Sequence, residues 1–239
     1  MSVENNNKIN KDNIEKYLNE FVNVFIKLNG RKMPAEIVLV GGASVLLNYK
    51  FRESTGDIDA IIISSSVAKE AARVIEDKYG LPSDWLNTDF IKTKSYSSKL
   101  REVSVFYKTY SDIVEIRTIK AENLIAMKLM AGRTYKNDLS DIVGILGEHE
   151  KIGKPIQYED INNAVVNIYN KWDNLPKESI SFIEDVFKRK EYNKMYDIIK
   201  IDEKKNKEML VKFNEENPKI ITKDNIKEIL KKIKNNNKL

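Results

Sequence analysis

Residues 38–63 read VLVGGASVLLNYKFRESTGDIDAIII, and this stretch decides the fold. The apolar segment Glu36–Val40 predicts a strand that stops at a Gly-Gly turn, and Ala43–Tyr49 predicts a short helix after the turn. The β-branched segment Ile58–Ile63 predicts a second strand, which begins at two aspartates one residue apart. A strand, a glycine turn, a short helix and an acidic strand therefore follow one another in close succession.

The segments on either side extend this pattern of helices and strands. Helical spacing and strand alternation predict further elements, which are helices over Asp12–Leu28 and Val67–Tyr79, strands over Leu100–Lys108 and Asp112–Thr118, and helices over Ala121–Ala131 and Asp138–Leu146. Ser66 and Asn137 are placed to cap the helices that follow them. The first half of the chain therefore mixes both kinds of element.

The pattern changes beyond Gly153 and Pro155, where strand signals end. Helical spacing predicts three more helices, over Ile161–Trp172, Ser179–Arg189 and Ile226–Ile233. This order predicts an α/β (α+β) fold with a mixed sheet flanked by helices, followed by an all-helical C-terminal region. We expect two domains, residues 1–150 with the leading helix and residues 151–239.

Composition excludes several kinds of site. The chain has 239 residues, no cysteine and a single histidine, His149, near a predicted helix end. Thiolate zinc sites and disulfide frameworks are excluded, and one imidazole builds neither a metal cluster nor a Ser-His-Asp triad. We therefore expect His149 to be a surface residue.

Charge and hydropathy indicate a cytoplasmic protein. Between Lys219 and Lys238 there are seven lysines and two acidic residues, an excess of five that equals the net charge of +5. A lysine-rich final helix favours a solvated face over a polynucleotide track. The first thirty residues are polar and carry acidic groups, unlike a signal peptide, and no apolar run approaches the roughly 18 residues of a membrane span.

The Gly-Gly turn is a candidate phosphate site. Phosphates bind where backbone N–H groups are exposed at a helix start and where no side chain blocks their approach. Gly41 and Gly42 end a strand and precede a short helix, and Ser44 adds a hydroxyl for a phosphate oxygen. Taken alone, these residues are more typical of a tight strand-to-helix turn.

The two aspartates are a candidate metal site. Strand alternation points Asp57 and Asp59 to one face and turns Ile58 to the other. Two like charges held so close repel, and a divalent cation relieves the repulsion; Mg²⁺ binds to a few carboxylates together with substrate phosphates. The alternative is an exposed Asx-turn ahead of a strand.

In combination, the two motifs resemble the polymerase-β-type nucleotidyltransferase superfamily. Its members carry a Gly-Gly or Gly-Ser turn and, about a dozen residues later, Asp-x-Asp. The resemblance covers Glu36–Leu146 and is nearest to a minimal bacterial branch that includes AbiEii-like toxin nucleotidyltransferases. Relatives there read Gly-Gly-x-Ala/Ser and then Arg-x-Thr-x-Asp-x-Asp, which implies nucleotide-binding roles for Arg52 and Thr55. Here Glu53-Ser54 lengthens the gap between those two residues.

The resemblance also implies roles for a helix lysine and a downstream Lys-x-Asp motif. Lys128 lies on an apolar helix face, where an unpaired ammonium would be costly to bury, so it is a candidate catalytic residue. The alternative is a lysine that extends to water. Arg133 and Lys136 precede a helix start and are candidates for phosphate binding, with Asp138. First-turn placement alone also explains Asp138 and Asp141.

A site of this type normally has a third carboxylate, and strand parity selects Glu115. If Val114 and Ile116 face the core, Glu115 points to the same face of the sheet as Asp57 and Asp59. The runner-up is Glu102. We therefore expect metal binding by Asp57, Asp59 and Glu115.

The expected function is transfer of NMP from an NTP to an unidentified acceptor, with Mg²⁺ or Mn²⁺ as cofactor. The acceptor can be RNA, protein or a small molecule, and no membrane partner is expected. The resemblance implies the toxin of a toxin–antitoxin or phage-defence system, with a cognate antitoxin protein. The alternative is a catalytically weak or inactive nucleotidyltransferase fold that serves as a binding or regulatory module. A sugar-nucleotide glycosyltransferase is disfavoured by the Gly-Gly turn and the short α/β half.

Overall fold

The structure is a computed structural model that describes residues 8–30, 35–62, 65–222 and 225–236. Its main sheet contains β2 (Ala35–Val40), β4 (Ile58–Ile62), β5 (Leu86–Asn87), β6 (Ser104–Tyr110) and β7 (Val114–Ile119). The strand order is β5-β4-β2-β7-β6, with β2 antiparallel to β4 and parallel to β7. The predicted mixed sheet is confirmed, although Ile63 of the second predicted strand lies outside the described residues.

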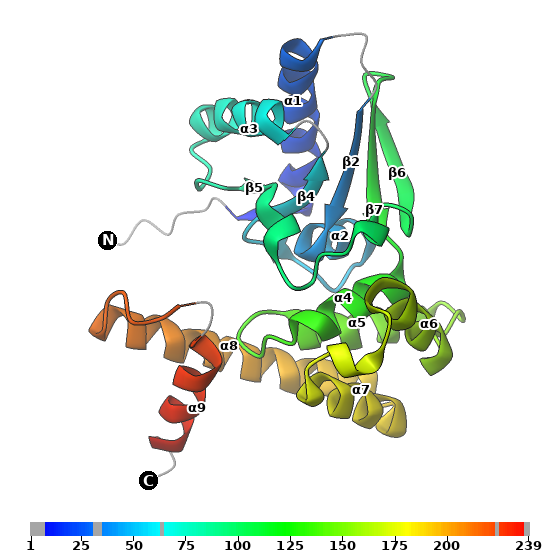
Figure 1. The fold of residues 1–239 in the computed structure, drawn as a ribbon, viewed down its shortest axis with the longest axis vertical. Helices are drawn as coiled ribbons and strands as arrows, with labels where there is room; N and C mark the ends of the chain where they lie inside the picture. Colours follow the sequence, from blue (N-terminus) through cyan, green and yellow to red (C-terminus); the bar gives the residue numbers. More distant parts are fainter. Residues whose placement is uncertain (1–7, 31–34, 63–64, 223–224, 237–239) are drawn as a thin grey trace.

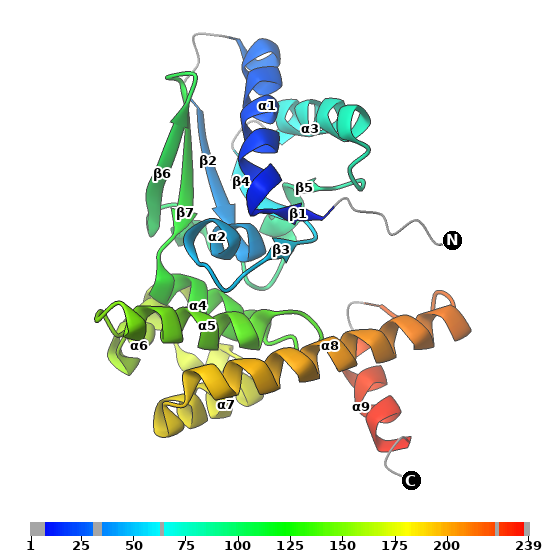
Figure 2. The same ribbon diagram turned by 180° about the vertical axis from the view of Figure 1, so that it is seen from behind.

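Two helices, α1 (Lys11–Asn29) and α3 (Ser65–Tyr79), cover one face of the sheet (Figure 1, Figure 2). Ile58, Ala60 and Ile62 of β4 point to this face and are buried there in one apolar cluster with α1 and α3. Because alternate residues of a strand point to opposite faces, Asp59 points away from α1 and α3. The apolar cluster with α1 and α3 therefore covers one face of β4 and leaves the face that carries Asp59 to other elements.

Short elements fix the segment between β2 and β4. The helix α2 (Gly41–Asn48) follows β2 directly, and β3 (Ser54–Thr55) lies just before β4. The strand β1 (Ile9–Asn10) pairs antiparallel with β3, so that Ile9 opposes Thr55. The start of the described chain thus holds the segment that leads into the two aspartates.

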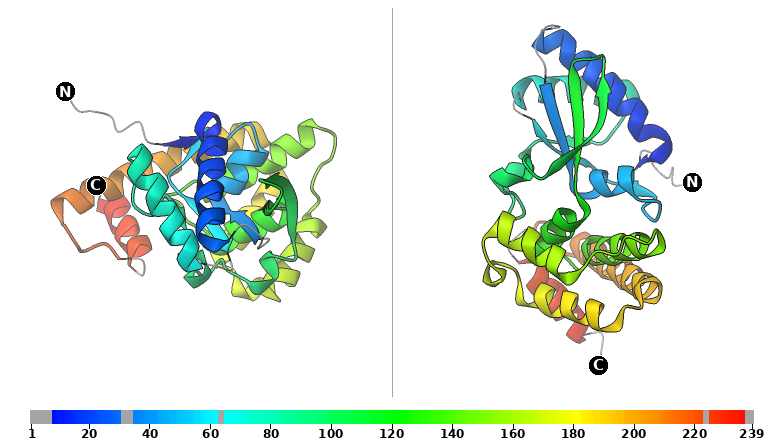
Figure 3. Two further views of the ribbon diagram at one scale, coloured as in Figure 1. Left: turned by 90° about the horizontal axis from the view of Figure 1, so that it is seen from above. Right: turned by 90° about the vertical axis from the view of Figure 1, so that its right-hand side faces the viewer.

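A layer of helices lies against one end of the sheet (Figure 1, Figure 3). It contains α4 (Ala121–Ala131), α5 (Asp138–Lys151), α6 (Tyr158–Tyr169), α7 (Lys177–Arg189), α8 (Tyr192–Glu216) and α9 (Ile226–Asn236). Val38 and Val40 of β2 belong to the apolar cluster of α4 to α8, so the layer packs directly on the sheet. Residue 150, the predicted domain boundary, falls within α5, inside this layer. No helix of the described residues is long and apolar enough to cross a membrane.

Several element ends differ from the sequence-based expectation. The strand predicted to begin at Leu100 begins at Ser104, because Leu100 lies in the short 3-10 helix η2 (Ser98–Leu100). Ser111 and Asp112 both have positive φ, 52° and 54°, and form the tight turn between β6 and β7. Paired positive φ values fit the right-handed twist of a hairpin, so Asp112 lies in the turn rather than in a strand.

Candidate active site

The Gly-Gly turn packs against the carboxylate at the start of β4. Gly41 has φ of 58°, a left-handed conformation that glycine adopts without strain. The register pairs Val40 with Asp59, which brings the end of β2 beside the start of β4. A Cβ atom on Gly41 would lie 3.1 Å from Asp59 Oδ2. Gly41 therefore allows the turn to approach this carboxylate closely.

Gly42 makes a second close approach, to the segment that precedes the aspartates. A Cβ atom on Gly42 would lie 2.5 Å from Thr55 Oγ1 and 3.2 Å from Arg52 Nη2. The Thr55 hydroxyl donates to the carbonyl oxygen of Asp57 at 3.0 Å and is itself buried. The space beside Gly42 is thus filled by side chains of this chain, and the spacing of the two motifs reflects direct packing between them.

Asp59 is held by a residue that sequence reasoning did not single out. Asn87 of β5 pairs with Asp59 of β4, and its Nδ2 donates to Asp59 Oδ1 at 3.1 Å. The other end of the same amide accepts from the backbone N–H of Asp89 at 2.7 Å, which fixes its orientation. In the sequence, Asn87 ends the segment Leu81–Asn87, which also looks like the corresponding segment of the resembling proteins.

The environment of Asp59 disfavours the ionised form of its carboxyl relative to that of an exposed aspartate. Burial, together with the nearby charge of Asp57, raises the pKa of Asp59 to about 6. Three cations act in the opposite direction, namely Lys136, Arg133 and Lys128. Asp59 is therefore a half-buried carboxylate under repulsion from one neighbour, with basic side chains within electrostatic reach.

These two carboxylates fit a divalent cation. The repulsion between Asp57 and Asp59 is the kind that a bound cation relieves, and carboxylate oxygens are the ligands that Mg²⁺ prefers. Within the described ranges, no group of three or more histidine or acidic side chains is assembled for a metal ion. The two aspartates would supply two ligands to such a cation, and substrate phosphates or water would have to supply the others.

Glu115 faces the same side of the sheet as Asp59, as expected, but lies far from Asp59 along the strands. Val114 and Ile116 are buried in the cluster under α1 and α3, which turns Glu115 to the face of Asp59. The register pairs Glu115 with Glu36 of β2, four residues from Val40, the partner of Asp59. At about 3.3 Å per residue this offset is about 13 Å.

The side chain of Glu115 has a different partner. It forms an ion pair with Arg117, two residues along β7. The runner-up, Glu102, is exposed in the turn that precedes β6. The structure therefore does not bring Glu115 or Glu102 together with Asp57 and Asp59.

A buried network of charges connects Arg52, which lies before β4, with the helices α4 and α5. The ammonium of Lys128 in α4 lies 3.0 Å from Asp138 Oδ1 and 2.8 Å from Asp141 Oδ2, both in α5. Arg52 donates from Nη1 to both oxygens of Asp141, at 2.7 and 2.8 Å. Arg133 Nε donates to Asp138 Oδ2 at 2.7 Å. Each carboxylate thus faces two cations.

The partners in this network keep one another charged. Lys128 and the two aspartates are almost fully buried, with exposed fractions of 6%, 0% and 1%. Burial lowers the pKa of Lys128, but Asp141 and Asp138 outweigh it and the pKa is raised overall. Burial likewise raises the pKa of Asp138, and Lys128 and Arg133 bring it below its usual range. Lys128 is therefore satisfied by carboxylates within the protein.

The remaining predicted residues divide into exposed and buried ones. Lys136 is exposed in the loop before α5, and Arg133 is partly exposed there. Ser44 is fully buried, and its hydroxyl accepts from the backbone N–H of Ile119 at 3.1 Å, so the structure does not bring it to the surface of the site. Thr55 is buried as well, and its hydroxyl donates to the carbonyl oxygen of Asp57. Of this group, Lys136 and Arg133 have the access that a phosphate needs.

Asn137 does not cap α5 as expected. It occupies the N-cap position, but its side chain forms no capping hydrogen bond. In the amide orientation that satisfies its partners, its oxygen accepts from Arg52 Nη1 at 3.0 Å and from Nη2 at 3.2 Å. The first turn of α5 is instead capped from α8, because Glu203 Oε1 accepts from the backbone N–H of Leu139 at 2.9 Å.

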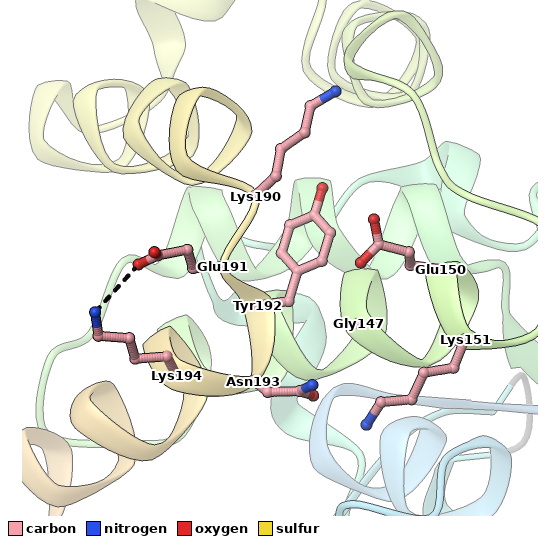
Figure 4. Close-up of a pocket in the computed structure, with 8 residues that line it drawn as sticks. All are labelled: Gly147, Glu150, Lys151, Lys190, Glu191, Tyr192, Asn193 and Lys194. Carbon is pink, nitrogen blue, oxygen red and sulfur yellow. Dashed lines mark ion pairs between the residues drawn. The ribbon is translucent and has the colours of Figure 1, made fainter.

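One surface pocket lies away from this site (Figure 4). It has a volume of about 300 Å³ and is lined by residues of the end of α5 and the start of α8, among them Gly147, Glu150 and Tyr192. Glu150 lies twelve residues beyond Asp138 on α5, which is about 18 Å along the helix. The polar lining of the pocket includes an ion pair of Glu191 with Lys194 at 3.5 Å. This pocket is therefore separate from the acidic site.

Comparison with known proteins gives one match. A family model described as "Nucleotidyltransferase of unknown function (DUF6036)" matches residues 16–209, from within α1 to within α8. No curated protein and no solved structure matches the chain. The matched region contains the acidic site, the buried charge network and the segment of α8 that caps α5.

Proposed function

The chain belongs to this family of nucleotidyltransferases, and we propose that it transfers NMP from an NTP to a hydroxyl group of an acceptor, with Mg²⁺ or Mn²⁺ held by Asp57 and Asp59. One observation carries the proposal. Asp59 lies beside the Gly41 turn, next to the charge of Asp57 and within electrostatic reach of Arg133 and Lys136. Acidic ligands for a cation and basic side chains for phosphates thus share one site.

The reaction class sets what each part of the site must do. The acceptor hydroxyl gives up its proton to water and its oxygen forms a bond to the α-phosphorus of the NTP, while the bond from that phosphorus to the bridging oxygen breaks and pyrophosphate leaves. A divalent cation bound by the aspartates would polarise the phosphoryl oxygens and offset the charge of the leaving group. The protein then needs only to position the reactants and stabilise negative charge.

Residues of this chain divide that work. Lys136 and Arg133 bind the phosphates, because they are the accessible cations of the loop before α5. Asn87 orients the carboxylate of Asp59 by its hydrogen bond to Oδ1. Lys128 is a positioning residue, because its ammonium pairs with the carboxylates of Asp138 and Asp141. These carboxylates in turn anchor Arg133 and Arg52.

A second candidate function follows from the position of Glu115. Glu115 lies about 13 Å along the strands from the level of Asp59, so the site contains only the carboxylates of Asp57 and Asp59 among the three that were expected. A site with two carboxylates suits nucleotide binding with slow or absent transfer. The second candidate is therefore a nucleotidyltransferase fold that binds a nucleotide as a regulatory module.

We propose a biological role from the sequence resemblance alone. The likeness of Gly41–Ser44 and Arg52–Asp59 to AbiEii-like toxins supports a toxin of a toxin–antitoxin or phage-defence pair, with an antitoxin protein as partner. Induced expression should then arrest growth, and Asp57→Asn should abolish the arrest. Equal growth of cells expressing wild-type protein and Asp57→Asn would reject the toxin role.

The transfer reaction is tested with labelled nucleotides. The protein is incubated with each α-³²P-labelled NTP, Mg²⁺ or Mn²⁺, and cell extract, and the labelled product is digested to identify RNA, protein or a small molecule. Asp57→Asn and Asp59→Asn are the controls, and both should give no labelled product. Nucleotide binding without any labelled product would favour the regulatory module, and labelling that persists in both variants would reject the metal assignment.

A further inference from the structure

The buried face of α8 is interrupted by two polar residues. Its other members are apolar and follow helical spacing from Tyr192 through Met195 to Leu210. Glu203 and Asn206 continue the same stripe, with exposed fractions of only 3% and 4%. Burying a carboxyl and an amide costs free energy unless each finds hydrogen-bond partners. Their partners therefore show what this part of α8 is adapted to hold.

Both side chains bind the same short segment of the chain. Glu203 Oε1 accepts from the backbone N–H groups of Leu139 and Ser140, at 2.9 and 3.4 Å. Ser140 Oγ donates to Glu203 Oε2 at 2.5 Å. Asn206 Nδ2 donates to the carbonyl oxygen of Thr134 at 2.6 Å. One turn of α8 thus caps the first turn of α5 and grips the loop that precedes it.

The gripped loop, residues 132–137, carries both phosphate-binding candidates. It leaves α4 at Gly132, whose φ of 51° ends that helix, and it enters α5 at Asp138. Arg133 is tied to Asp138, whereas Lys136 is exposed. Asn206 holds the carbonyl oxygen of Thr134, between these two residues. The position of Lys136 relative to Asp57 and Asp59 therefore depends on the grip of α8.

We propose that Glu203 and Asn206 are positioning residues for the nucleotide: they hold the loop 132–137 so that Arg133 and Lys136 face the metal-binding aspartates. This role rests on the proposed function. It gives the C-terminal helical region a part in nucleotide binding although neither residue reaches the site. Asp59 lies in β4, where Asn87 holds it, and Asp57 directly precedes this strand, so cation binding alone does not depend on Glu203 and Asn206.

A purely structural cap predicts a different result from a positioning residue. A structural cap lowers stability when it is removed, but the remaining folded protein binds nucleotide as before. A positioning residue lowers the affinity of the folded protein for NTP and leaves its affinity for the cation unchanged. Nucleotide affinity, cation affinity and loop protection must therefore be measured on folded protein.

The experiment uses the full chain with Asn206→Ala, Glu203→Ala and Glu203→Gln. Binding of Mn²⁺ alone, and of each of the four NTPs with Mn²⁺, is measured by calorimetry, and amide hydrogen exchange is followed over residues 132–140. We expect Asn206→Ala to bind NTP at least tenfold more weakly, with faster exchange in this segment and an unchanged Mn²⁺ affinity. Glu203→Ala removes the acceptor for the backbone N–H groups and should weaken NTP binding in the same way, whereas Glu203→Gln keeps an oxygen acceptor there and should restore it.

Two matched substitutions on the exposed face of α8 serve as controls. Asn193→Ala and Glu208→Gln repeat the same chemical changes at exposed positions and should leave every measurement unchanged. Wild-type NTP affinity in Asn206→Ala, with or without faster exchange, overturns the positioning role and leaves the proposed function standing. If the wild-type protein binds Mn²⁺ but no NTP, the proposed function fails and the positioning role fails with it.

Discussion

The ionised carboxylate of Asp59 lowers the stability of the fold because of where it lies. Its carboxylate is half-buried beside Asp57, and the left-handed Gly41 lets the chain turn close to it. Burial and the neighbouring charge both disfavour the ionised form. A folded protein tolerates such a group when the charge serves a ligand. In this site the ligand is the proposed divalent cation.

Replacing Asp59 should make the metal-free protein more stable at alkaline pH. The pKa of Asp59 is raised from 3.8 to about 6, so the folded protein holds this proton more tightly than the unfolded chain does. Stability therefore falls as pH rises through this window, and above it the penalty is at most about 3 kcal/mol. We expect Asp59→Asn to raise the melting temperature in EDTA at pH 8, and the gain to shrink towards pH 4.

The same variant should lose its response to the cation. Mg²⁺ should raise the melting temperature of the wild type at pH 8 and leave that of Asp59→Asn unchanged, because ligand binding stabilises only a protein that binds it. A wild-type protein that is insensitive to Mg²⁺, or a variant that is destabilised at pH 8, would contradict this account of Asp59.

Gly42 offers a steric test of the packing between the two motifs. A methyl group there would lie 2.5 Å from Thr55 Oγ1, which cannot move freely because it donates to the carbonyl oxygen of Asp57. Gly42→Ala should therefore cost about 1 to 3 kcal/mol in the free energy of unfolding, measured by urea titration. Gly56→Ala is the matched control, because nothing lies within 4 Å of the added methyl group. Equal stability of both variants would show that the packing is loose.

At the scale of elements, the pair α4 and α5 is joined by charge. Apolar packing holds most of the interface, but Lys128 of α4 is buried between Asp138 and Asp141 of α5. From sequence, Lys128 is a candidate catalytic residue, and the alternative is a lysine that extends to water. Its partners in the structure change that expectation, since a buried pair that loses one member leaves an uncompensated charge.

Removing the charge of Lys128 should therefore destabilise the fold. Lys128→Met retains the apolar stem but leaves Asp138 and Asp141 facing only Arg133 and Arg52. We expect a loss of about 3 kcal/mol in the free energy of unfolding, measured by denaturant titration at pH 7. Lys120→Met, at the exposed N-cap of α4, should have little effect. An unchanged stability of Lys128→Met would show that the ammonium is dispensable for the helix pair.

At the scale of the whole molecule, α8 connects parts that are distant in sequence. Tyr192 and Met195 near its start are buried in the apolar cluster shared with β2 and α4 to α7. Its middle holds the loop before α5, through Glu203 and Asn206. Tyr196 also donates to the carbonyl oxygen of Phe51, in the segment that leads to the aspartates. The final helix, α9, adds one buried apolar residue among those described, Leu230.

Truncation should separate the contributions of α8 and α9. A chain that ends at residue 217 loses α9 and should retain a cooperative thermal transition within a few degrees of the full chain. A chain that ends at residue 190 also loses α8, which exposes the apolar cluster and leaves the start of α5 uncapped, so it should show no cooperative transition. Thermal unfolding followed by circular dichroism checks both. Cooperative folding of the shorter chain would contradict the role of α8.

Local periodicity determined much of this protein. The longer strands and helices of residues 36–146 follow from alternation and helical spacing, with ends that differ by a few residues, whereas the two-residue strands β3 and β5 were not predicted. The same period of two placed Asp59 and Glu115 on one face of the sheet. Periodicity did not determine the register of β7. A shift of β7 by an even number of residues keeps each side chain on the same face of the sheet but moves Glu115 along the strand.

Only the tertiary structure decided the partners of the buried charges and the place of α8. Arg52 meets Asp141 across 89 residues of sequence, and Glu203 meets Ser140 across 63. No element was predicted at residues 192–216, where α8 lies, because Glu203 and Asn206 interrupt its apolar stripe. Polar residues there look like solvent-facing ones until their partners are known. Short-range pattern reports which face a residue occupies, whereas its hydrogen-bond partner depends on which surfaces pack together.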